Sequence, residues 1–169
     1  MLSEKEIIEL VKNGWLVTNF IDMNTQIQPA GVDLSVGKIF VQKTEGVLDF
    51  DNSKRVLPEL EEILTHTDYW ELEPGAYIIV PNEYIKLPKN MAAIVLPRSS
   101  AAMCGLAIHS ALWEPGYEGR GIIYVTISKR VKIFKNTRFG QIIFFYTTGN
   151  SNYNGIFKGE DVLKHGKRV

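Results

Sequence analysis

The chain of 169 residues is long enough for one domain with a full hydrophobic core. Lys plus Arg and Asp plus Glu each number 19, which argues against non-specific binding of DNA or RNA, because that binding needs an excess of positive charge. The single cysteine, Cys104, excludes an internal disulfide framework and a cysteine-based zinc site, so we expect a reducing, cytoplasmic location. The charged N-terminus resembles neither a signal peptide nor a membrane span, and we expect no membrane partner.

Two helices are predicted from local patterns. The N-terminal segment, residues 1–14, has the pattern of an amphipathic helix. The helix is predicted over residues 3–13, because Ser3 and Glu6 can form a capping box and Gly14 can end the helix. A second, short helix is predicted over Leu57–Thr65, because a proline stands in its first turn and three glutamates stand near its positive end.

Most other segments predict strands, because they are short, rich in β-branched and aromatic residues, and separated by Gly, Pro and Asn. The predicted strands are Lys38–Gln42, Ala76–Val80, Met91–Leu96, Gly121–Ile127, Val131–Phe134 and Gln141–Tyr146. Strands and helices do not alternate, which argues against a parallel α/β sheet. We therefore predict one all-β domain over residues 1–169, built as a sandwich, jelly roll or barrel. The polar residues 150–169 predict a tail that is either mobile or ordered by a ligand, or a solvated terminus without a role.

The most informative segment lies between residues 96 and 120, where an arginine, two serines, a glutamate and a tyrosine stand close together in the sequence. Arg98, Ser99 and Ser100 follow an apolar strand and precede two alanines, which would let a ligand or a second subunit approach the backbone. A guanidinium and two hydroxyls suit phosphate oxygens. The same tripeptide is also common in surface turns, so this segment alone does not establish a phosphate site.

A glycine-containing turn follows at residues 114–119. Glu114 comes after an apolar triplet, where a partly desolvated carboxylate could deprotonate water. A solvated turn glutamate is the more common case. Tyr117 could lie under a sugar ring or pack in the core.

Three polar residues outside that segment are also candidates. Arg138 and Gln141 stand at the start of the last long strand, where the glutamine could bind a ligand or the backbone. Asp33 follows a turn and could bind a metal-bound water or pair with an arginine. His109 and the other two histidines have no metal-ligand spacing, and no glycine-rich phosphate loop is present.

Together, four segments resemble the ordered motifs of the dUTPase and dCTP deaminase superfamily. They are AGVDL at 30–34, PRSS at 97–100, ALWEPGYEGR at 111–120 and RFGQIIF at 138–144. The N-terminal helix, QIQPAGVDL and WELEPGAYIIV at 70–80 are more similar to the deaminase branch, on whose frame archaeal-type dUTPases are built. The resemblance implies an all-β distorted jelly roll, or β-clip, in a homotrimer with sites at subunit interfaces.

One position distinguishes the two branches. Deaminases of the superfamily carry a glutamate five residues after the glycine that ends the third motif, and that glutamate shuttles protons during attack on cytosine. Counted from Gly119, the position here holds Tyr124. A phenol with a pKa near 10 is a poor proton shuttle at neutral pH, so we expect Tyr124 to pack or to line the pocket.

The resemblance assigns roles to the third motif. Glu114 matches the carboxylate, normally aspartate, that activates water for attack on the α-phosphate and contacts the sugar 3′-OH. Tyr117 matches the aromatic residue that stacks under deoxyribose. Backbone groups of the segment Ile108–Leu112, which includes His109 and Ser110, match those that read uracil.

The other motifs match the phosphate site. The matching residues from the second and fourth motifs are Arg98, Ser99, Ser100, Arg138 and Gln141, and Asp33 matches the first-motif carboxylate that supports the metal and phosphate site. Mg²⁺ would be held largely by the triphosphate and waters, with no direct protein ligand. In place of an arginine- and glycine-rich tail the chain has NYNGIFKGED at 152–161, where Lys158 is the candidate phosphate contact.

The expected reaction is therefore Mg²⁺-dependent hydrolysis of dUTP to dUMP and pyrophosphate. The nearest alternative is a dCTP deaminase, or a bifunctional enzyme, that uses another proton carrier. A further alternative is a non-catalytic nucleotide-binding member of the fold. It is favoured because position 114 holds a glutamate where the family normally has an aspartate.

Overall fold

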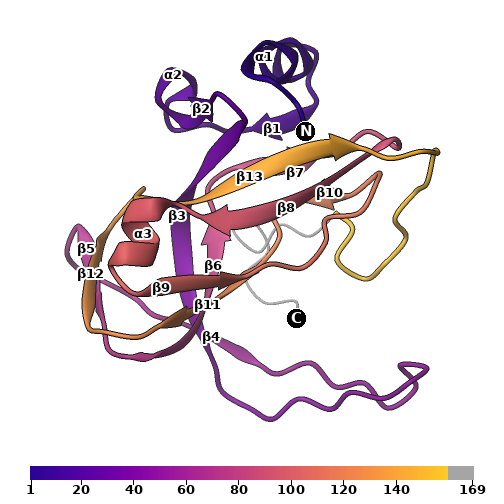
Figure 1. Ribbon diagram of the computed structural model, residues 1–169. Coiled ribbons are helices and arrows are strands. Elements are labelled where there is room, and N and C mark those ends of the chain that lie inside the picture. The colour runs from indigo at the N-terminus through magenta and orange to yellow at the C-terminus, as the bar shows by residue number, and fades with distance from the viewer. Residues whose placement is uncertain (160–169) are drawn as a thin grey trace.

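A computed structural model describes residues 1–159 of the protein (Figure 1). Antiparallel strands make up most of the regular secondary structure of this part of the chain, and three short helices accompany them. The helices are α1 (Glu4–Lys12), α2 (Met23–Gln26) and α3 (Ser99–Met103). The strands are β1 (Leu16–Thr18), β2 (Ile27–Gln28), β3 (Gly31–Gln42), β4 (Leu60–Glu62), β5 (Tyr69–Leu72), β6 (Gly75–Pro81), β7 (Tyr84–Lys86), β8 (Met91–Pro97), β9 (Leu106–His109), β10 (Glu118–Gly119), β11 (Ile123–Ile127), β12 (Val131–Phe134) and β13 (Arg138–Tyr146).

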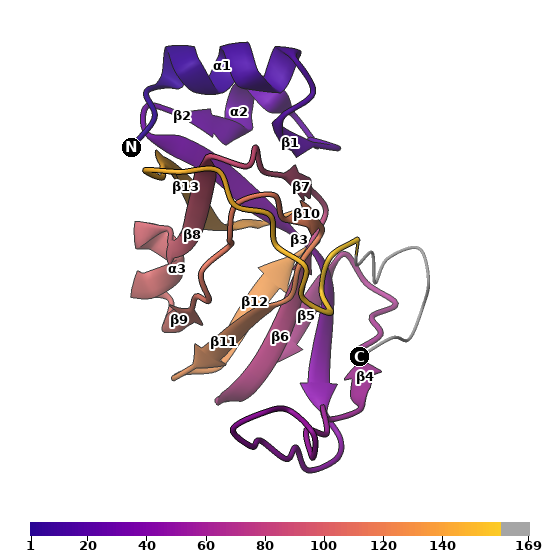
Figure 2. The same ribbon diagram turned by 90° about the vertical axis from the view of Figure 1, so that its right-hand side faces the viewer.

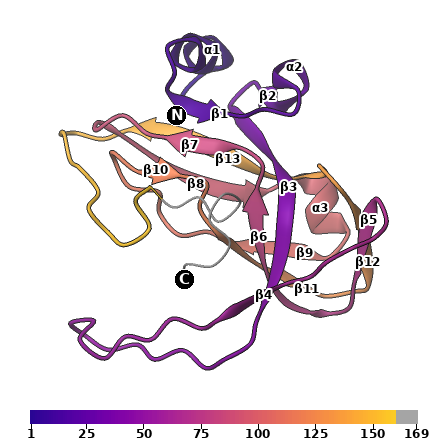
Figure 3. The ribbon, with the colours of Figure 1, turned by 180° about the vertical axis from the view of Figure 1, so that it is seen from behind.

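The main sheet has the strand order β8-β13-β3-β6-β11-β9, and β2 and β4 also pair with β3. Its two outer strands approach each other, since the Val95 N–H of β8 donates to Ser110 Oγ just after β9, at 2.9 Å. The sheet is therefore nearly closed into a barrel. Strands β1, β7 and β10 form a second sheet, and β5 and β12 form a small third one on the opposite side from β7 and β10 (Figure 3).

The hydrophobic core lies inside this near-barrel. Strand β11 shows the pattern clearly, because Ile123, Val125 and Ile127 are buried while the two residues between them are half-buried. Such alternation places every second side chain on the inner face. Phe139 and Phe144 of β13 are the largest fully buried side chains. No helix among residues 1–159 is long and apolar enough to span a membrane.

The predicted N-terminal helix is confirmed as α1, which lies across one end of the sheets beside β1 and β2 (Figure 2). The carboxylate of Glu6 accepts hydrogen bonds from the Ser3 N–H at 2.8 Å and from the Ser3 hydroxyl at 2.7 Å. Ile7 is fully buried on the inner side of the helix. Leu2, just before the helix, is also held to the sheet, because its N–H donates to the Phe144 carbonyl of β13 at 3.0 Å.

The predicted helix over Leu57–Thr65 is wrong, because Leu60–Glu62 form strand β4 and pair with the end of β3. Two ion pairs support this pairing, Lys38 with Glu62 and Lys43 with Glu61, each at 2.8 Å. Cross-strand pairing outweighs the local helix signals, which carry only a small free energy per residue.

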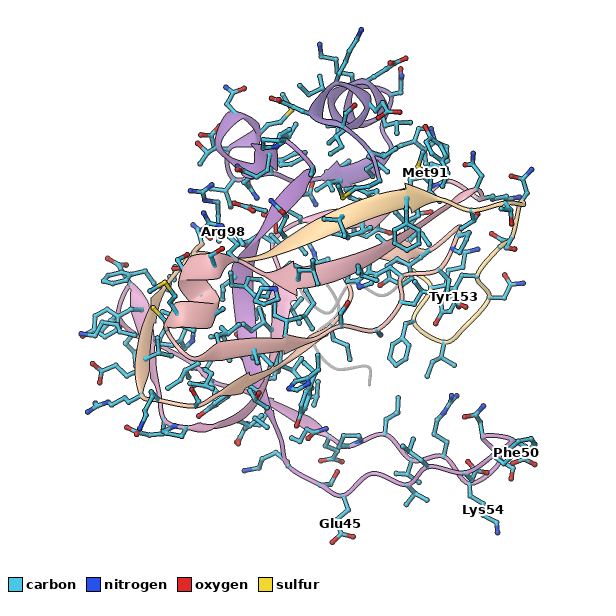
Figure 4. The ribbon with its side chains drawn as sticks, in the orientation of Figure 1. Glu45, Phe50, Lys54, Met91, Arg98 and Tyr153 are labelled. Carbon is cyan, nitrogen blue, oxygen red and sulfur yellow. The ribbon has the colours of Figure 1, made fainter. Side chains whose placement is uncertain are left out.

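Between β3 and β4 the chain forms a projecting arm over residues 43–59 (Figure 4). A single bridge joins Val47 and Val56, and Phe50 near the tip is fully exposed.

The six predicted strands are present, one with the predicted ends (Val131–Phe134) and five with shifted ends. The largest difference is β3, which begins at Gly31 rather than Lys38. Glycine is required there, because a Cβ at position 31 would lie 2.5 Å from the Ile142 carbonyl oxygen of β13. This close approach allows β2 and β13 to pair with the same end of β3.

Candidate active site

The predicted phosphate-binding residues come together at one end of the main sheet. Asp33, Arg98, Ser99, Ser100 and Gln141 line one cavity of about 380 Å³, together with Gln28 and Pro97. We call this the phosphate cavity. Gln28 is the one polar residue of this cavity that the sequence did not single out, although it stands within the QIQPAGVDL segment.

Antiparallel pairing explains why these distant residues meet. Gln141 lies opposite Asp33 of β3 on one side and opposite Leu96 of β8 on the other. The Arg98 N–H then donates to the Phe139 carbonyl at 3.1 Å, which carries the β8–β13 contact past the end of the strand. The two serines open the short helix α3, which the sequence pattern did not predict.

The carboxylate of Asp33 is the electrostatic centre of the phosphate cavity. One oxygen accepts from Arg98 Nε at 2.9 Å and from Arg138 Nη1 at 3.1 Å, and the other accepts from Gln141 Nε2 at 3.4 Å. Burial raises the pKa of Asp33, and the two guanidinium groups partly offset this effect. Of the two roles considered for Asp33, the geometry supports pairing with arginine. Two guanidinium groups against one carboxylate leave the site net positive, which suits an anionic ligand.

A second cavity, of about 360 Å³, lies along β11 and the turn that follows β9. We call it the aromatic cavity, because its walls include His109, Trp113, Tyr117, Tyr124 and Tyr153. Glu114 also lines it and carries the carboxylate that the sequence identified.

Of the two positions considered for Tyr117, the structure shows packing in the core, and the residue also lines the aromatic cavity. Its ring centroid lies 5.0 Å from that of Trp113 and 5.7 Å from that of Tyr153. Glu114 is exposed in the single chain, while its neighbour Trp113 is buried. The partial desolvation considered for Glu114 is therefore not present in one chain alone.

Tyr124 lines the aromatic cavity, as expected. It lies opposite His109 in the β11–β9 pair, and the two ring centroids are 5.5 Å apart. His109 Nε2 is also 3.1 Å from the Thr126 hydroxyl. No sequence signal predicted this arrangement of His109 between two side chains of β11.

The segment expected to read a base divides into two parts. The backbones of Ile108 and His109 belong to the β9–β11 ladder. After them, Ser110 contacts β8 through its hydroxyl, and Leu112 is exposed at the mouth of the aromatic cavity. Residues 110–112 therefore have backbone groups outside any named strand.

Residues 150–159 of the predicted tail pack on the turn that holds Glu114. The Tyr153 N–H donates to the Pro115 carbonyl at 2.8 Å, and the Gly159 N–H donates to the Glu118 carbonyl at 2.6 Å. Lys158 donates to Asn152 Oδ1 at 3.1 Å, which places it on the side of the aromatic cavity. Within residues 1–159, Lys158 does not line the phosphate cavity of its own chain. The rest of the predicted tail lies outside the described residues.

The two cavities lie toward opposite ends of β8. Ala93 pairs with Trp113, next to Glu114, and Arg98 stands five residues further along the chain. At about 3.3 Å per residue, these positions are about 17 Å apart along the strand. Figure 4 shows the same separation, with Arg98 beyond one end of β8 and with Met91 and Tyr153 toward the other.

The described residues contain no group of three His, Cys, Asp or Glu side chains able to hold a metal ion. Asp33, the carboxylate of the phosphate cavity, is already paired with two arginines.

Comparison with known proteins defines the family. A family model described as dCTP deaminase-like matches residues 1–147, and the chain belongs to this family.

Several similar proteins are archaeal. The chain is 38% identical over 168 residues to a probable deoxyuridine 5′-triphosphate nucleotidohydrolase of Methanococcoides burtonii, covering 96% of this chain and 99% of that protein. It is 40% identical over 146 residues to the deoxyuridine 5′-triphosphate nucleotidohydrolase of Methanocaldococcus jannaschii, covering 83% of this chain and 94% of that protein.

A solved structure supports the fold. The 2′-deoxycytidine 5′-triphosphate deaminase of Agrobacterium tumefaciens superposes with a TM-score of 0.62 at 24% identity, over 85% of this chain. The match spans 46% of that longer chain. The predicted all-β distorted jelly roll is thereby confirmed.

Proposed function

We propose that this protein hydrolyses dUTP to dUMP and pyrophosphate. The observation that carries the proposal is the composition of the aromatic cavity, in which Glu114 is present and Tyr124 occupies the position of the deaminase glutamate. The archaeal relatives named as deoxyuridine 5′-triphosphate nucleotidohydrolases support it.

In this mechanism the phosphate cavity binds the triphosphate chain. Arg98 is held by Asp33 through its Nε and donates from Nη1 to the Arg138 carbonyl at 3.1 Å, so Nη2 is the terminal nitrogen that would bind phosphate oxygens. The hydroxyls of Ser99 and Ser100 and the Gln141 amide add neutral donors. Arg138 stands behind Asp33 and adds positive charge without lining the cavity itself.

Glu114 is the proposed general base. It accepts a proton from water as the water oxygen bonds to the α-phosphorus, and the bond from that phosphorus to the bridging oxygen of pyrophosphate breaks. The products are dUMP and pyrophosphate, with the bonding electrons leaving on pyrophosphate. Tyr117 would support the deoxyribose, and the backbone of residues 110–112 would contact uracil.

We further propose a homotrimer in which one subunit supplies the phosphate cavity and its neighbour supplies Glu114. Reacting groups must come within about 3–3.5 Å of each other, whereas the two cavities of one chain are about 17 Å apart along β8. A neighbouring subunit over Glu114 would also provide the desolvation that the single chain lacks.

Mg²⁺ is proposed to arrive as part of the substrate, bound to the triphosphate and water. The donor set of the phosphate cavity fits this role, because its carboxylate, Asp33, is paired with two arginines and its other polar side chains are donors that suit phosphate. When bound, the ion supplies charge neutralisation and alignment of the phosphates. A cytoplasmic location remains a proposal that rests on the lone Cys104.

The direct test is incubation of the purified protein with dUTP and with dCTP in the presence of Mg²⁺, with identification of the products. We expect dUMP and pyrophosphate from dUTP, and no ammonia from dCTP. Release of ammonia from dCTP would favour the deaminase alternative. Tight dUTP binding without turnover would favour a non-catalytic nucleotide-binding protein. The exposure of Glu114 in one chain is consistent with that alternative.

A matched pair of variants tests the proposed base. Glu114→Gln should retain nucleotide binding and lose about 3 to 4 kcal/mol of transition-state stabilisation, the range seen when one catalytic group is removed. Glu118→Gln, four residues away and paired at 3.8 Å with Lys86, is the control and should turn over normally. Equal turnover in the two variants would show that Glu114 is not the general base.

A further inference from the structure

Directly behind the phosphate cavity lies a fully buried carboxylate that the proposed mechanism does not use. Glu83 stands between β6 and β7, and its side chain has no solvent exposure. Of residues 1–159, no lysine or arginine forms an ion pair with it. A buried charge is costly unless it is hydrogen-bonded or paired, so its position calls for specific donors.

Three donors surround this carboxylate. Oε1 accepts from Gln26 Nε2 at 2.7 Å and from the Ser35 hydroxyl at 2.6 Å. Oε2 accepts from the Ser35 N–H at 2.8 Å. Hydrogen bonds to a charged acceptor are the strong ones, so Glu83 fixes one side chain of α2 and one residue of β3.

Gln26 carries this constraint to the phosphate cavity. Its amide nitrogen donates to Glu83 and also to the Asp33 carbonyl, the latter at 2.8 Å. Its amide oxygen accepts from the N–H groups of Ile21 and Asp22 at 2.8 and 3.0 Å. Both donors and both acceptor positions of the amide are therefore used, and the orientation of Gln26 is fixed.

The helix that Gln26 holds in place also contacts Arg138, the arginine behind the cavity. The carbonyl of Thr25 in α2 accepts from Arg138 Nη1 at 2.8 Å and from Gln28 Nε2 at 2.9 Å. The same Arg138 nitrogen donates to Asp33 at 3.1 Å. A shift of α2 would therefore turn Arg138, and with it the carboxylate that holds Arg98.

We propose that Glu83 is a positioning residue for the phosphate cavity, acting through Gln26 and Ser35 on the Thr25 carbonyl and on Asp33. This inference rests on one part of the proposed function, the binding of a triphosphate in the cavity. It does not depend on which base the nucleotide carries or on whether the phosphoanhydride is cleaved.

The test uses the isosteric variant Glu83→Gln of the full chain. A glutamine here would point an N–H₂ group at the donors of Gln26 or Ser35. The probes are inorganic tripolyphosphate, titrated calorimetrically with and without Mg²⁺, and 2′-deoxyuridine, which lacks phosphate. The control is Glu62→Gln, which removes a carboxylate of the same sheet that pairs with Lys38.

We expect Glu83→Gln to bind tripolyphosphate on the order of 10-fold more weakly, as when an outer partner of a binding group is removed. Its affinity for 2′-deoxyuridine should be unchanged, and Glu62→Gln should bind both probes as the wild type does. In turnover, KM for dUTP should rise by more than kcat falls. A purely structural role would instead weaken both probes together or weaken neither, and either result would overturn the proposal.

If Glu83→Gln does not fold, Ser35→Ala removes one of the three donors and Gln26→Met removes the link to Asp33. Both should show the same selective loss of tripolyphosphate binding. A wild-type protein that binds tripolyphosphate but does not convert dUTP would refute the proposed function and leave this inference standing. A wild type that binds no tripolyphosphate under either condition would overturn the inference.

Discussion

Replacement of Asp33 by asparagine separates two opposing effects in the phosphate cavity. The Asp33 side chain is 2% exposed, whereas those of Arg98 and Arg138 are 29% and 31% exposed. Burial of the carboxylate opposes its charge, and the two guanidinium groups favour it. Asparagine keeps the shape and one acceptor oxygen, but removes the charge that both arginines need.

We expect the arginine contacts to outweigh the relieved burial cost. Breaking a fully buried ion pair from one side costs about 3–5 kcal/mol, but water reaches both arginines here and lowers that figure. Two hydrogen bonds that lose their charged acceptor then suggest a net destabilisation of about 2 kcal/mol. For a chain of this length, the melting temperature should fall by about 4–8 °C.

The assay is thermal and urea unfolding of wild type and Asp33→Asn at one fixed protein concentration, with and without tripolyphosphate. Bound phosphate would replace the missing carboxylate as counter-ion of Arg98, so the stability difference should shrink when the ligand is present. Equal stability without ligand would show that the burial cost cancels the ion pairs. A difference that does not change with ligand would refute the assignment of this cavity to phosphate.

Two further predictions concern stability. Gly121→Ala should lower the free energy of unfolding by about 2–5 kcal/mol, because φ is +70° and the new Cβ would clash with Trp113 Cη2. The control Gly14→Ala has φ of +78° but no atom within 4 Å of its new Cβ, so it should lose only about 1–2 kcal/mol. Urea unfolding measures both, and equal losses would contradict the clash. Burial raises the pKa of Glu83 in the folded protein above 4.5, its ordinary value. At a pH between 4.5 and this raised pKa, the folded protein binds a proton that the unfolded chain does not. The free energy of unfolding should therefore fall as the pH rises through this range. Glu83→Gln should flatten this slope in unfolding measurements across pH, and an unchanged slope would assign it to other groups.

Much of the fold was predictable because its signals are local. Short runs rich in β-branched and aromatic residues identified six of the strands, and the Ser3–Glu6 pair marked the first helix correctly. The error at Leu57–Thr65 arose because a proline followed by glutamates is a helix signal, while pairing of β4 with β3 depends on residues about twenty positions earlier. Local propensity could not reveal that partner.

The candidate site divides in the same way. Asp33, Arg98 and Gln141 were found through motifs, and the structure places them in one cavity. The network behind them was not predictable, because Gln26 and Ser35 stand 57 and 48 residues from Glu83. A glutamate in a Pro-Asn-Glu-Tyr sequence has the composition of an exposed turn, and only the tertiary structure shows that it is buried.

The distance between the two cavities along β8 has a genetic consequence under the proposed trimer. A chain defective in Arg98 still carries an intact Glu114, and a chain defective in Glu114 still carries an intact phosphate cavity. Neither variant would be active alone, yet mixed trimers would contain some centres assembled from two sound halves. Two inactive alleles expressed together would therefore restore part of the activity. This complementation would follow from the separation of the two cavities along β8.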